Sequence, residues 1–167
     1  MSDGEPSKTH TDGDGWTHCQ LGHRHWGIFG AAGLLVCSVD EEGRACVLLQ
    51  HRSDFSHHGG TWGIPGGARG QREDAQTAAF REAVEEADLP VEQVRVRYVH
   101  VDDHGGWSYQ TVIADAAAPL PTTPNAESVA LVWQPVPDVD QLPLHPGFAH
   151  SWPTLRGLLP GGSEDPV

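Results

Sequence analysis

The sequence predicts a single α/β domain in which strands are layered with one central helix and one terminal helix. Apolar runs bounded by Gly, Asp and Pro recur along the chain, as is typical of strands. One segment in the middle has the apolar spacing of an amphipathic helix, and another near the C-terminus is expected to close the domain. At 167 residues, the chain has the size of one domain with a core that can fold unaided.

The first elements expected along the chain form a β-hairpin. Its strands are predicted over 30–39 and 45–51, with a turn at Asp40–Gly43 between them. A short extended piece is expected over 61–64, because Pro65 disfavours helical geometry at the residue before it.

The central helix is predicted over 74–88, after a turn that starts at Gly66. Its small or apolar residues recur at helical spacing, and its acidic residues lie on another face. The residues with the apolar spacing are Ala75, Ala78, Ala79, Ala83 and Val84.

Three more strands and the closing helix are expected in the second half of the chain. The strands are predicted over 94–101, 107–114 and 129–133, the first two being joined by a turn-like segment. The closing helix is predicted over 148–159, with Pro153 in its first turn. The polar segments 1–15 and 161–167 lack periodicity and are predicted to be disordered tails, which leaves 16–160 as the domain.

The charge balance argues against polymeric nucleic acid and a membrane surface as partners. Lys and Arg total 10 against 23 Asp and Glu, a net charge of −13, whereas a protein that neutralises phosphates along a polymer needs a surplus of cations.

The longest apolar run, 28–39, is too short to span a bilayer, and no secretory h-region is visible. The three cysteines fit a reducing cytoplasm better than a disulfide framework.

Three carboxylates on the central helix point to chemistry. Glu82, Glu85 and Glu86 lie at i, i+3 and i+4, so they share one helical face at separations of about 5–6 Å. A hard divalent cation would turn their mutual repulsion into ligation, because Mg²⁺ prefers carboxylate oxygens and water. By itself this spacing is also typical of a solvated acidic face, so the neighbouring residues decide between the two.

The segment from Gly67 to Leu89 resembles the Nudix box, the sequence signature of the Nudix hydrolases. The matching residues are Gly67, Glu73, Arg81, Glu82, Glu85, Glu86 and Leu89. Two positions depart from the pattern: Ala83 stands where a larger aliphatic residue is usual, and Asp88 replaces a glycine. Asp can adopt left-handed geometry, although its charge lies unfavourably beside a helix C-terminus.

The resemblance implies a Nudix-type α/β/α sandwich with a central mixed sheet, and hydrolysis of the pyrophosphate linkage in a small nucleotide by water attack at phosphorus. It also implies Mg²⁺ as cofactor, with Mn²⁺ as a substitute. Carried over residue by residue, the metal ligands are Glu82 and Glu86, then Glu85, and the backbone carbonyl of Gly67. A pyrophosphate would be repelled by a chain of net charge −13 unless a cation bridged the two.

The resemblance leaves the catalytic base open. Glu82 and Glu85 are candidates on the helix, and Glu127 resembles a carboxylate that many relatives place before the corresponding strand. Glu127 is equally compatible with metal binding and with a surface position. Glu73 and Arg81 are expected to form a structural ion pair that ties the loop to the helix, and such a pair is damaged badly when one partner is removed.

Three residues outside the box are candidate substrate contacts. Arg52 lies at the end of the strand 45–51, where relatives often place a cation that meets phosphate. Trp107 and Tyr109 alternate on a strand and are candidates for stacking on a base, although aromatic residues at this period more often belong to a core.

Histidines near the N-terminus raise the question of a transition metal. Cys19, His23 and His25 have ligand types suited to zinc. Their spacing matches no common structural zinc pattern and no fourth ligand is evident, so the sequence does not predict a zinc site. The pair His57-His58, in the loop before the box, faces either substrate or solvent.

The leading hypothesis is therefore a Mg²⁺-dependent Nudix pyrophosphohydrolase. The alternative is a catalytically silent Nudix domain that senses a nucleotide, but such a domain is free to lose carboxylates that this chain keeps. The substrate stays open because loops outside the box select it, with a slight leaning toward a nucleoside triphosphate, as in MutT-like enzymes. A homodimer is compatible with the sequence, which leaves the oligomeric state open.

Overall fold

The computed structural model describes residues 11–54 and 58–159. Its main strands are β3 (Ala31–Val39), β4 (Ala45–Arg52), β5 (Trp62–Gly63), β6 (Gly66–Ala68), β7 (Arg95–Asp103), β8 (Ser108–Asp115) and β9 (Ser128–Pro135). They form one seven-stranded sheet in the order β5-β4-β3-β8-β7, with β6 paired to β3 and β9 paired to β4. The sheet is mixed, because β3 runs parallel to β8 and antiparallel to β4.

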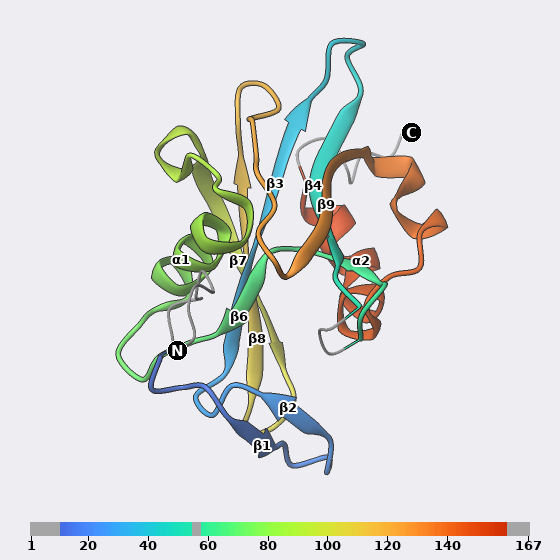
Figure 1. Ribbon diagram of the computed structural model, residues 1–167. Helices are drawn as coiled ribbons and strands as arrows, with labels where there is room; N and C mark the ends of the chain where they lie inside the picture. Colours follow the sequence, from blue (N-terminus) through green and yellow to red (C-terminus); the bar gives the residue numbers. More distant parts are fainter. Residues whose placement is uncertain (1–10, 55–57, 160–167) are drawn as a thin grey trace.

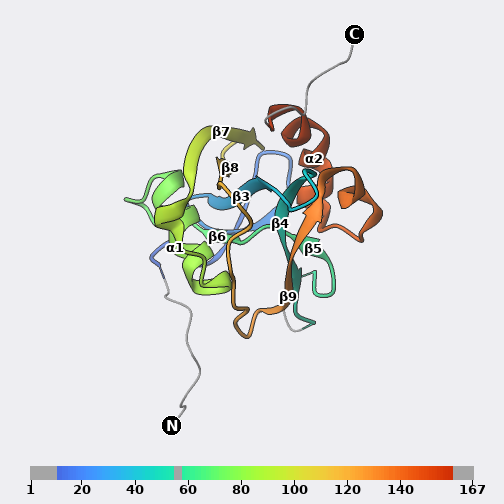
Figure 2. The same ribbon diagram turned by 90° about the horizontal axis from the view of Figure 1, so that it is seen from above.

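The two helices cover opposite faces of this sheet. α1 (Ala75–Ala87) and α2 (Pro146–Leu158) lie on either side of it (Figures 1 and 2). Successive residues of β3 point to opposite faces, so Leu34 packs into the core beneath α1, whereas Leu35 packs into the core beneath α2. The predicted α/β/α sandwich is confirmed.

The central strands match the sequence-based expectations because each is a long apolar run between turn residues. β3 and β4 form the predicted hairpin, in which Asp40 N–H donates to the Arg44 carbonyl at 2.9 Å and Gly43 takes a φ of +78°. β7 and β8 form the second antiparallel pair around the predicted turn.

Two local predictions are wrong. Gly66 does not start a turn but begins β6, which pairs with β3 so closely that a Cβ at Gly66 would lie 2.7 Å from the Ala32 carbonyl oxygen. Pro153 does not lie in the first turn of α2 but inside the helix, because the helix begins earlier, at Pro146. The His145 side chain caps that helix by accepting a hydrogen bond from Gly147 N–H at 3.0 Å.

A small N-terminal hairpin is absent from the sequence-based expectations, because each of its strands spans only three residues. It consists of β1 (Trp16–His18) and β2 (Arg24–Trp26) and lies below the main sheet in Figure 1. Residues 11–15, assigned to the N-terminal tail by their composition, bond to the domain, for example through Asp12 Oδ1, which accepts from Gln71 N–H at 2.9 Å. Residues 1–10 of the predicted N-terminal tail and all of the predicted C-terminal tail, 161–167, lie outside the described residues.

Short 3-10 turns complete the fold, at Val91–Gln93 after α1 and at Val136–Gln141 after β9. Across the described part of the chain, neither α-helix has the length and apolar character needed to cross a membrane.

The ends of α1 are defined by two aspartates. Asp74 caps the N-terminus, where its side chain accepts a hydrogen bond from Thr77 N–H at 2.8 Å. Asp88 ends the helix in left-handed geometry, with φ 51° and ψ 38°, and its N–H bonds back to the carbonyls of Ala83 and Val84. Asp88 thus adopts the left-handed backbone that the sequence allows for it, which is the geometry that glycine adopts without strain.

We expect Asp88→Gly to stabilise the protein by about 1 kcal/mol, because the left-handed backbone is strained for a residue with a Cβ. For a domain of this size the melting temperature should rise by about 2–4 °C. Asp88→Asn is the matched control, since it removes the charge beside the helix C-terminus but keeps a side chain. An equal rise in both variants would assign the effect to charge rather than to backbone geometry.

Candidate active site

Two of the three predicted carboxylates are buried between α1 and the sheet. Glu82 is 1% exposed and Glu86 is 3% exposed, whereas Glu85 lies on the flank of the helix and is partly buried. A solvated acidic face, which the spacing alone also allows, does not describe Glu82 and Glu86. Burying a carboxylate is costly unless hydrogen bonds or cations stabilise it. The groups around Glu86 and Glu82 therefore have to provide that stabilisation.

Glu86 is held by two donors from the sheet side. Its Oε1 accepts a hydrogen bond from Gly66 N–H at 3.1 Å and one from Gln50 Nε2 at 3.3 Å. Gln50 also donates to Ser128 Oγ at 2.8 Å, so one buried amide links β4, β9 and α1. Sequence reasoning missed Gln50 and Ser128, although a glutamine inside the apolar run of β4 is a signal that could have found the first of them.

Glu82 lies against the glycine-rich strand β6. A Cβ at Gly67 would lie 2.6 Å from Glu82 Oε2, so only glycine leaves room for this carboxylate. Arg81 Nη1 donates to the same Oε2 at 3.0 Å. The structure thus brings together Gly67 and Glu82, two residues that the sequence proposes as neighbours at a metal ion.

We expect Gly67→Ala to lower kcat/KM at least about tenfold, because the new methyl group would displace the Glu82 carboxylate and small misplacements at an active site are costly. Steady-state kinetics over a range of Mg²⁺ concentrations measure the effect. Gly157→Ala is the matched control, because a Cβ at this position in α2 meets nothing within 4 Å. Equal activity of the two variants would contradict the assigned role of Gly67.

The carboxylate of Glu85 differs from those of Glu82 and Glu86 in its hydrogen bonding. Both of its oxygens are buried and make no hydrogen bond to the described residues. Arg81 Nη1 lies 3.6 Å from Glu85 Oε1, an ion pair in which both side chains are less than a fifth exposed. This carboxylate is therefore positioned to accept a proton or to ligate a cation.

The predicted ion pair between Glu73 and Arg81 is present. Arg81 Nε and Nη2 each donate to one oxygen of Glu73 at 2.8 Å, and Nη2 also donates to the Ala68 carbonyl at 3.1 Å. The hydrogen bonds from the Arg81 guanidinium hold the pKa of Glu73 below its ordinary value. The pair joins the loop before α1 to the helix and to β6, which fits a structural role.

Arg52 ends β4, and Tyr109 lies on β8. Burial raises the pKa of Tyr109, the negative charge of Glu86 adds to this effect, and the positive charge of Arg52 opposes it. A Cβ at Gly66 would lie 2.6 Å from the Tyr109 hydroxyl, and Tyr109 packs against the core beneath α2.

Glu127 is tied to the helix through its loop. Glu127 N–H donates to Asn125 Oδ1 at 2.8 Å, and Asn125 Nδ2 donates to the Glu85 carbonyl at 2.9 Å. The Glu127 carbonyl accepts from Ser53 N–H at 3.0 Å, next to Arg52. The loop therefore holds the backbone of Glu127 beside both α1 and the end of β4.

Trp107 lies in a core cluster, the alternative that the sequence favours over base stacking. It is 8% exposed, its ring stacks on His25 with centroids 3.9 Å apart, and its Nε1–H donates to the Gly27 carbonyl at 2.8 Å. These contacts make it a packing residue of the N-terminal hairpin in this structure. His57 lies outside the described residues, and His58 is exposed.

The fold and the box geometry agree with the comparison against known families. The NUDIX domain model matches residues 30–157, which covers most of the chain. The chain belongs to the Nudix hydrolase family, and it is an enzyme of the pyrophosphohydrolase class.

Individual relatives support the same assignment. A putative 8-oxo-dGTP diphosphatase 3 of Mycobacterium tuberculosis is 49% identical over 151 residues, which cover 87% of this chain and 70% of the relative. A nucleoside triphosphate pyrophosphatase/Nudix hydrolase fusion protein of Bifidobacterium longum is 40% identical over 155 residues, 90% of this chain but 32% of that protein. The crystal structure of the Nudix hydrolase RenU from M. smegmatis superimposes with a TM-score of 0.82 at 49% identity, covering 93% of this chain and 99% of that one.

Proposed function

We propose that this protein hydrolyses the pyrophosphate linkage of a small nucleotide by direct attack of water at phosphorus, with a divalent cation held by the α1 carboxylates. The observation that carries the proposal is the burial of Glu82 and Glu86 side by side in a Nudix box. Two buried carboxylates with a third beside them are costly in an apolar core, and a divalent cation offsets that cost.

The donor set fits Mg²⁺ or Mn²⁺. Carboxylate and carbonyl oxygens are the ligands that these cations prefer, and Glu82, Glu86, Glu85 and the carbonyl of Gly67 would hold the ion. The Glu82 carboxylate fills the space left at Gly67 by the missing side chain, so the two residues lie beside each other. When bound, the cation neutralises the pyrophosphate oxygens and the charge that develops on the bridging oxygen.

The residues around this set have distinct roles in the proposal. Glu85, whose oxygens make no hydrogen bond to the described residues, accepts a proton from the attacking water. Glu127 is the alternative base, because its loop is bound to the Glu85 carbonyl through Asn125. Arg52 contacts a substrate phosphate from the end of β4.

A nucleoside triphosphate is the substrate class that we favour. The Mycobacterium tuberculosis relative is named for 8-oxo-dGTP, and its 49% identity over most of this chain supports a purine triphosphate here. Attack at the α-phosphorus of such a substrate releases a nucleoside monophosphate and pyrophosphate.

A nucleotide panel tests this proposal. The purified protein is assayed with 8-oxo-dGTP, dGTP, ADP-ribose and a dinucleoside tetraphosphate, each with Mg²⁺, with Mn²⁺ and with EDTA. We expect metal-dependent turnover that is fastest with a triphosphate and that yields monophosphate. Turnover in EDTA would contradict the metal assignment, and a preference for ADP-ribose would contradict the substrate class. Absence of turnover on every nucleotide, with tight binding of one, would support a sensor instead.

A further inference from the structure

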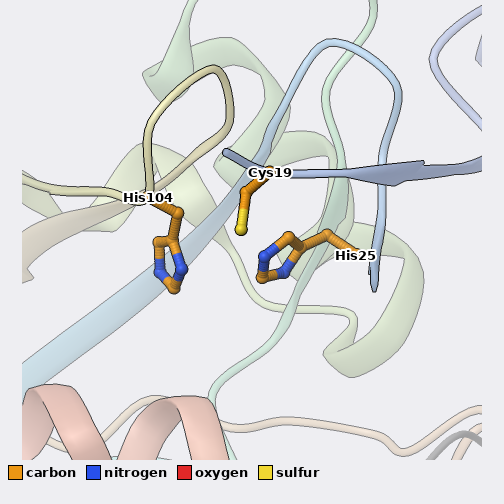
Figure 3. A group of neighbouring side chains, drawn as sticks. All are labelled: Cys19, His25 and His104. Atoms are coloured by element: carbon orange, nitrogen blue, oxygen red, sulfur yellow. The ribbon is translucent and has the colours of Figure 1, made fainter. Parts of the chain in front are cut away.

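We infer that Cys19, His25 and His104 form a second metal site, which binds Zn²⁺ and ties the N-terminal hairpin to the turn between β7 and β8. Their ligand atoms all lie within 4.8 Å of one another, and the three side chains converge in Figure 3. A thiolate and imidazoles suit zinc, whereas the oxygen ligands on α1 suit Mg²⁺. The inference stands independently of the proposed hydrolysis.

The N-terminal hairpin supplies two of the three ligands. His25 lies on β2 opposite Thr17 of β1, and Cys19 is two residues beyond Thr17 along the chain. Cys19 N–H donates to the His23 carbonyl at 3.0 Å, which closes the hairpin turn between the two ligands. His23, the third residue of the sequence cluster, is exposed and does not join the group.

The third ligand comes from a turn that is remote in sequence. His104 follows β7, and its backbone N–H donates to the Trp107 backbone carbonyl at 2.7 Å. Gln20 N–H donates to the Gly105 carbonyl at 2.8 Å, so the backbone itself docks the hairpin onto this turn. Gly105 has a φ of +79°, which a side chain would strain. The ligands are thus brought together by backbone contacts that need no ion.

Neighbouring groups fix the orientation of the two imidazoles. Asp102 Oδ2 lies 3.1 Å from His104 Nε2, a carboxylate contact that places the proton on Nε2 and leaves Nδ1 to bind a cation. Trp107 stacks on the ring of His25 at an interplanar angle of 7°. A carboxylate on the far nitrogen of a ligating histidine is a common feature of zinc sites.

One buried atom in this group makes no hydrogen bond. His25 Nε2 is buried and has no hydrogen-bond partner among the described residues. A buried polar atom without a partner is costly, and a metal ion would remove that cost.

The spacing of the group permits closure around zinc. In a tetrahedral site the ligand atoms lie about 3.5 Å apart, given Zn–S and Zn–N distances of about 2.3 and 2.0 Å. The ligand atoms here lie within 4.8 Å of one another. Side-chain rotations that move each atom by about 1 Å therefore bring them to the distances of a tetrahedral zinc site. Three protein ligands leave one coordination position for water.

Cobalt substitution tests the site in the full chain. The reduced protein is titrated with Co²⁺ in excess Mg²⁺, which occupies the α1 carboxylates, and then with Zn²⁺. We expect one Co²⁺ per chain with a thiolate-to-cobalt charge-transfer band, which Zn²⁺ abolishes. Absence of that band from the wild-type protein would overturn the proposal without recourse to any variant.

Variants then assign the ligands. Cys19→Ser should abolish the band and weaken Zn²⁺ binding about 10²-fold or more, and Asp102→Asn should weaken it about 10- to 100-fold. His150→Ala, which alters an exposed histidine on α2, is the matched control and should leave binding unchanged. Zinc binding that survives Cys19→Ser but is lost in Glu86→Gln would place the ion on the carboxylates and overturn the proposal.

Discussion

Glu86→Gln is expected to lower kcat about 10²-fold or more while the protein stays folded. The substitution keeps the size of the side chain but removes the charge from a carboxylate that is 3% exposed. Loss of a group that positions charge against the transition state has effects of this magnitude. Steady-state kinetics on the preferred triphosphate, at saturating Mg²⁺, measure the change.

Two features make the Glu86 experiment decisive. Gln in place of Glu86 still accepts the hydrogen bond from Gly66 N–H, so the link between α1 and β6 is kept. Glu92→Gln is the matched control, because Glu92 is exposed in the short turn after α1. A Glu86→Gln enzyme with the turnover of the Glu92→Gln enzyme would contradict the assignment of the carboxylates.

Arg81→Met is expected to lower the free energy of unfolding by about 3 kcal/mol, because it leaves the largely buried carboxylates of Glu73 and Glu82 without their cation. The melting temperature should fall by about 6–12 °C. Chemical denaturation and thermal melts measure the loss. Activity also falls in this variant, so stability is the readout that separates its role from that of Glu86.

The pH dependence provides the control for the ion pair. The pKa of Glu73 is lowered in the folded state by hydrogen bonds from Arg81. The pair therefore contributes stability that is present above the unfolded pKa of a glutamate and is lost as the pH falls through the lower folded value. The difference in stability between the wild type and Glu73→Gln should shrink in acid. A difference that is constant with pH would exclude the ion pair as its cause.

The sequence predicts the frame of this fold well where its local signals are strong. The central helix is expected over 74–88 and found at Ala75–Ala87, because an N-cap and a left-handed end mark both boundaries. The hairpin strands are found within a residue of the expected ranges, because each is a long apolar run next to turn residues. β6 was not expected, since a strand of two glycines and an alanine has no strand signal and forms only by pairing with β3.

Some residues of the candidate site could be predicted from local sequence spacing, and others only from the fold. The Nudix box supplies Glu82, Glu85 and Glu86 from one helical turn, so spacing alone groups them. Gln50 and Ser128 reach Glu86 from two other strands, and only the sheet register brings them there. His104 joins Cys19 and His25 across more than 75 residues of chain, and no local pattern indicates such a contact.

Hydrolysis in ¹⁸O-labelled water tests the central claim most directly. A single turnover of a nucleoside triphosphate, with enzyme in excess and Mg²⁺ present, is followed by mass analysis of both products. Direct attack of water at the α-phosphorus predicts one heavy oxygen in the nucleoside monophosphate and none in pyrophosphate. Unlabelled products in that first turnover would show that an enzyme group supplies the oxygen, and would contradict the roles given to Glu82, Glu85 and Glu86.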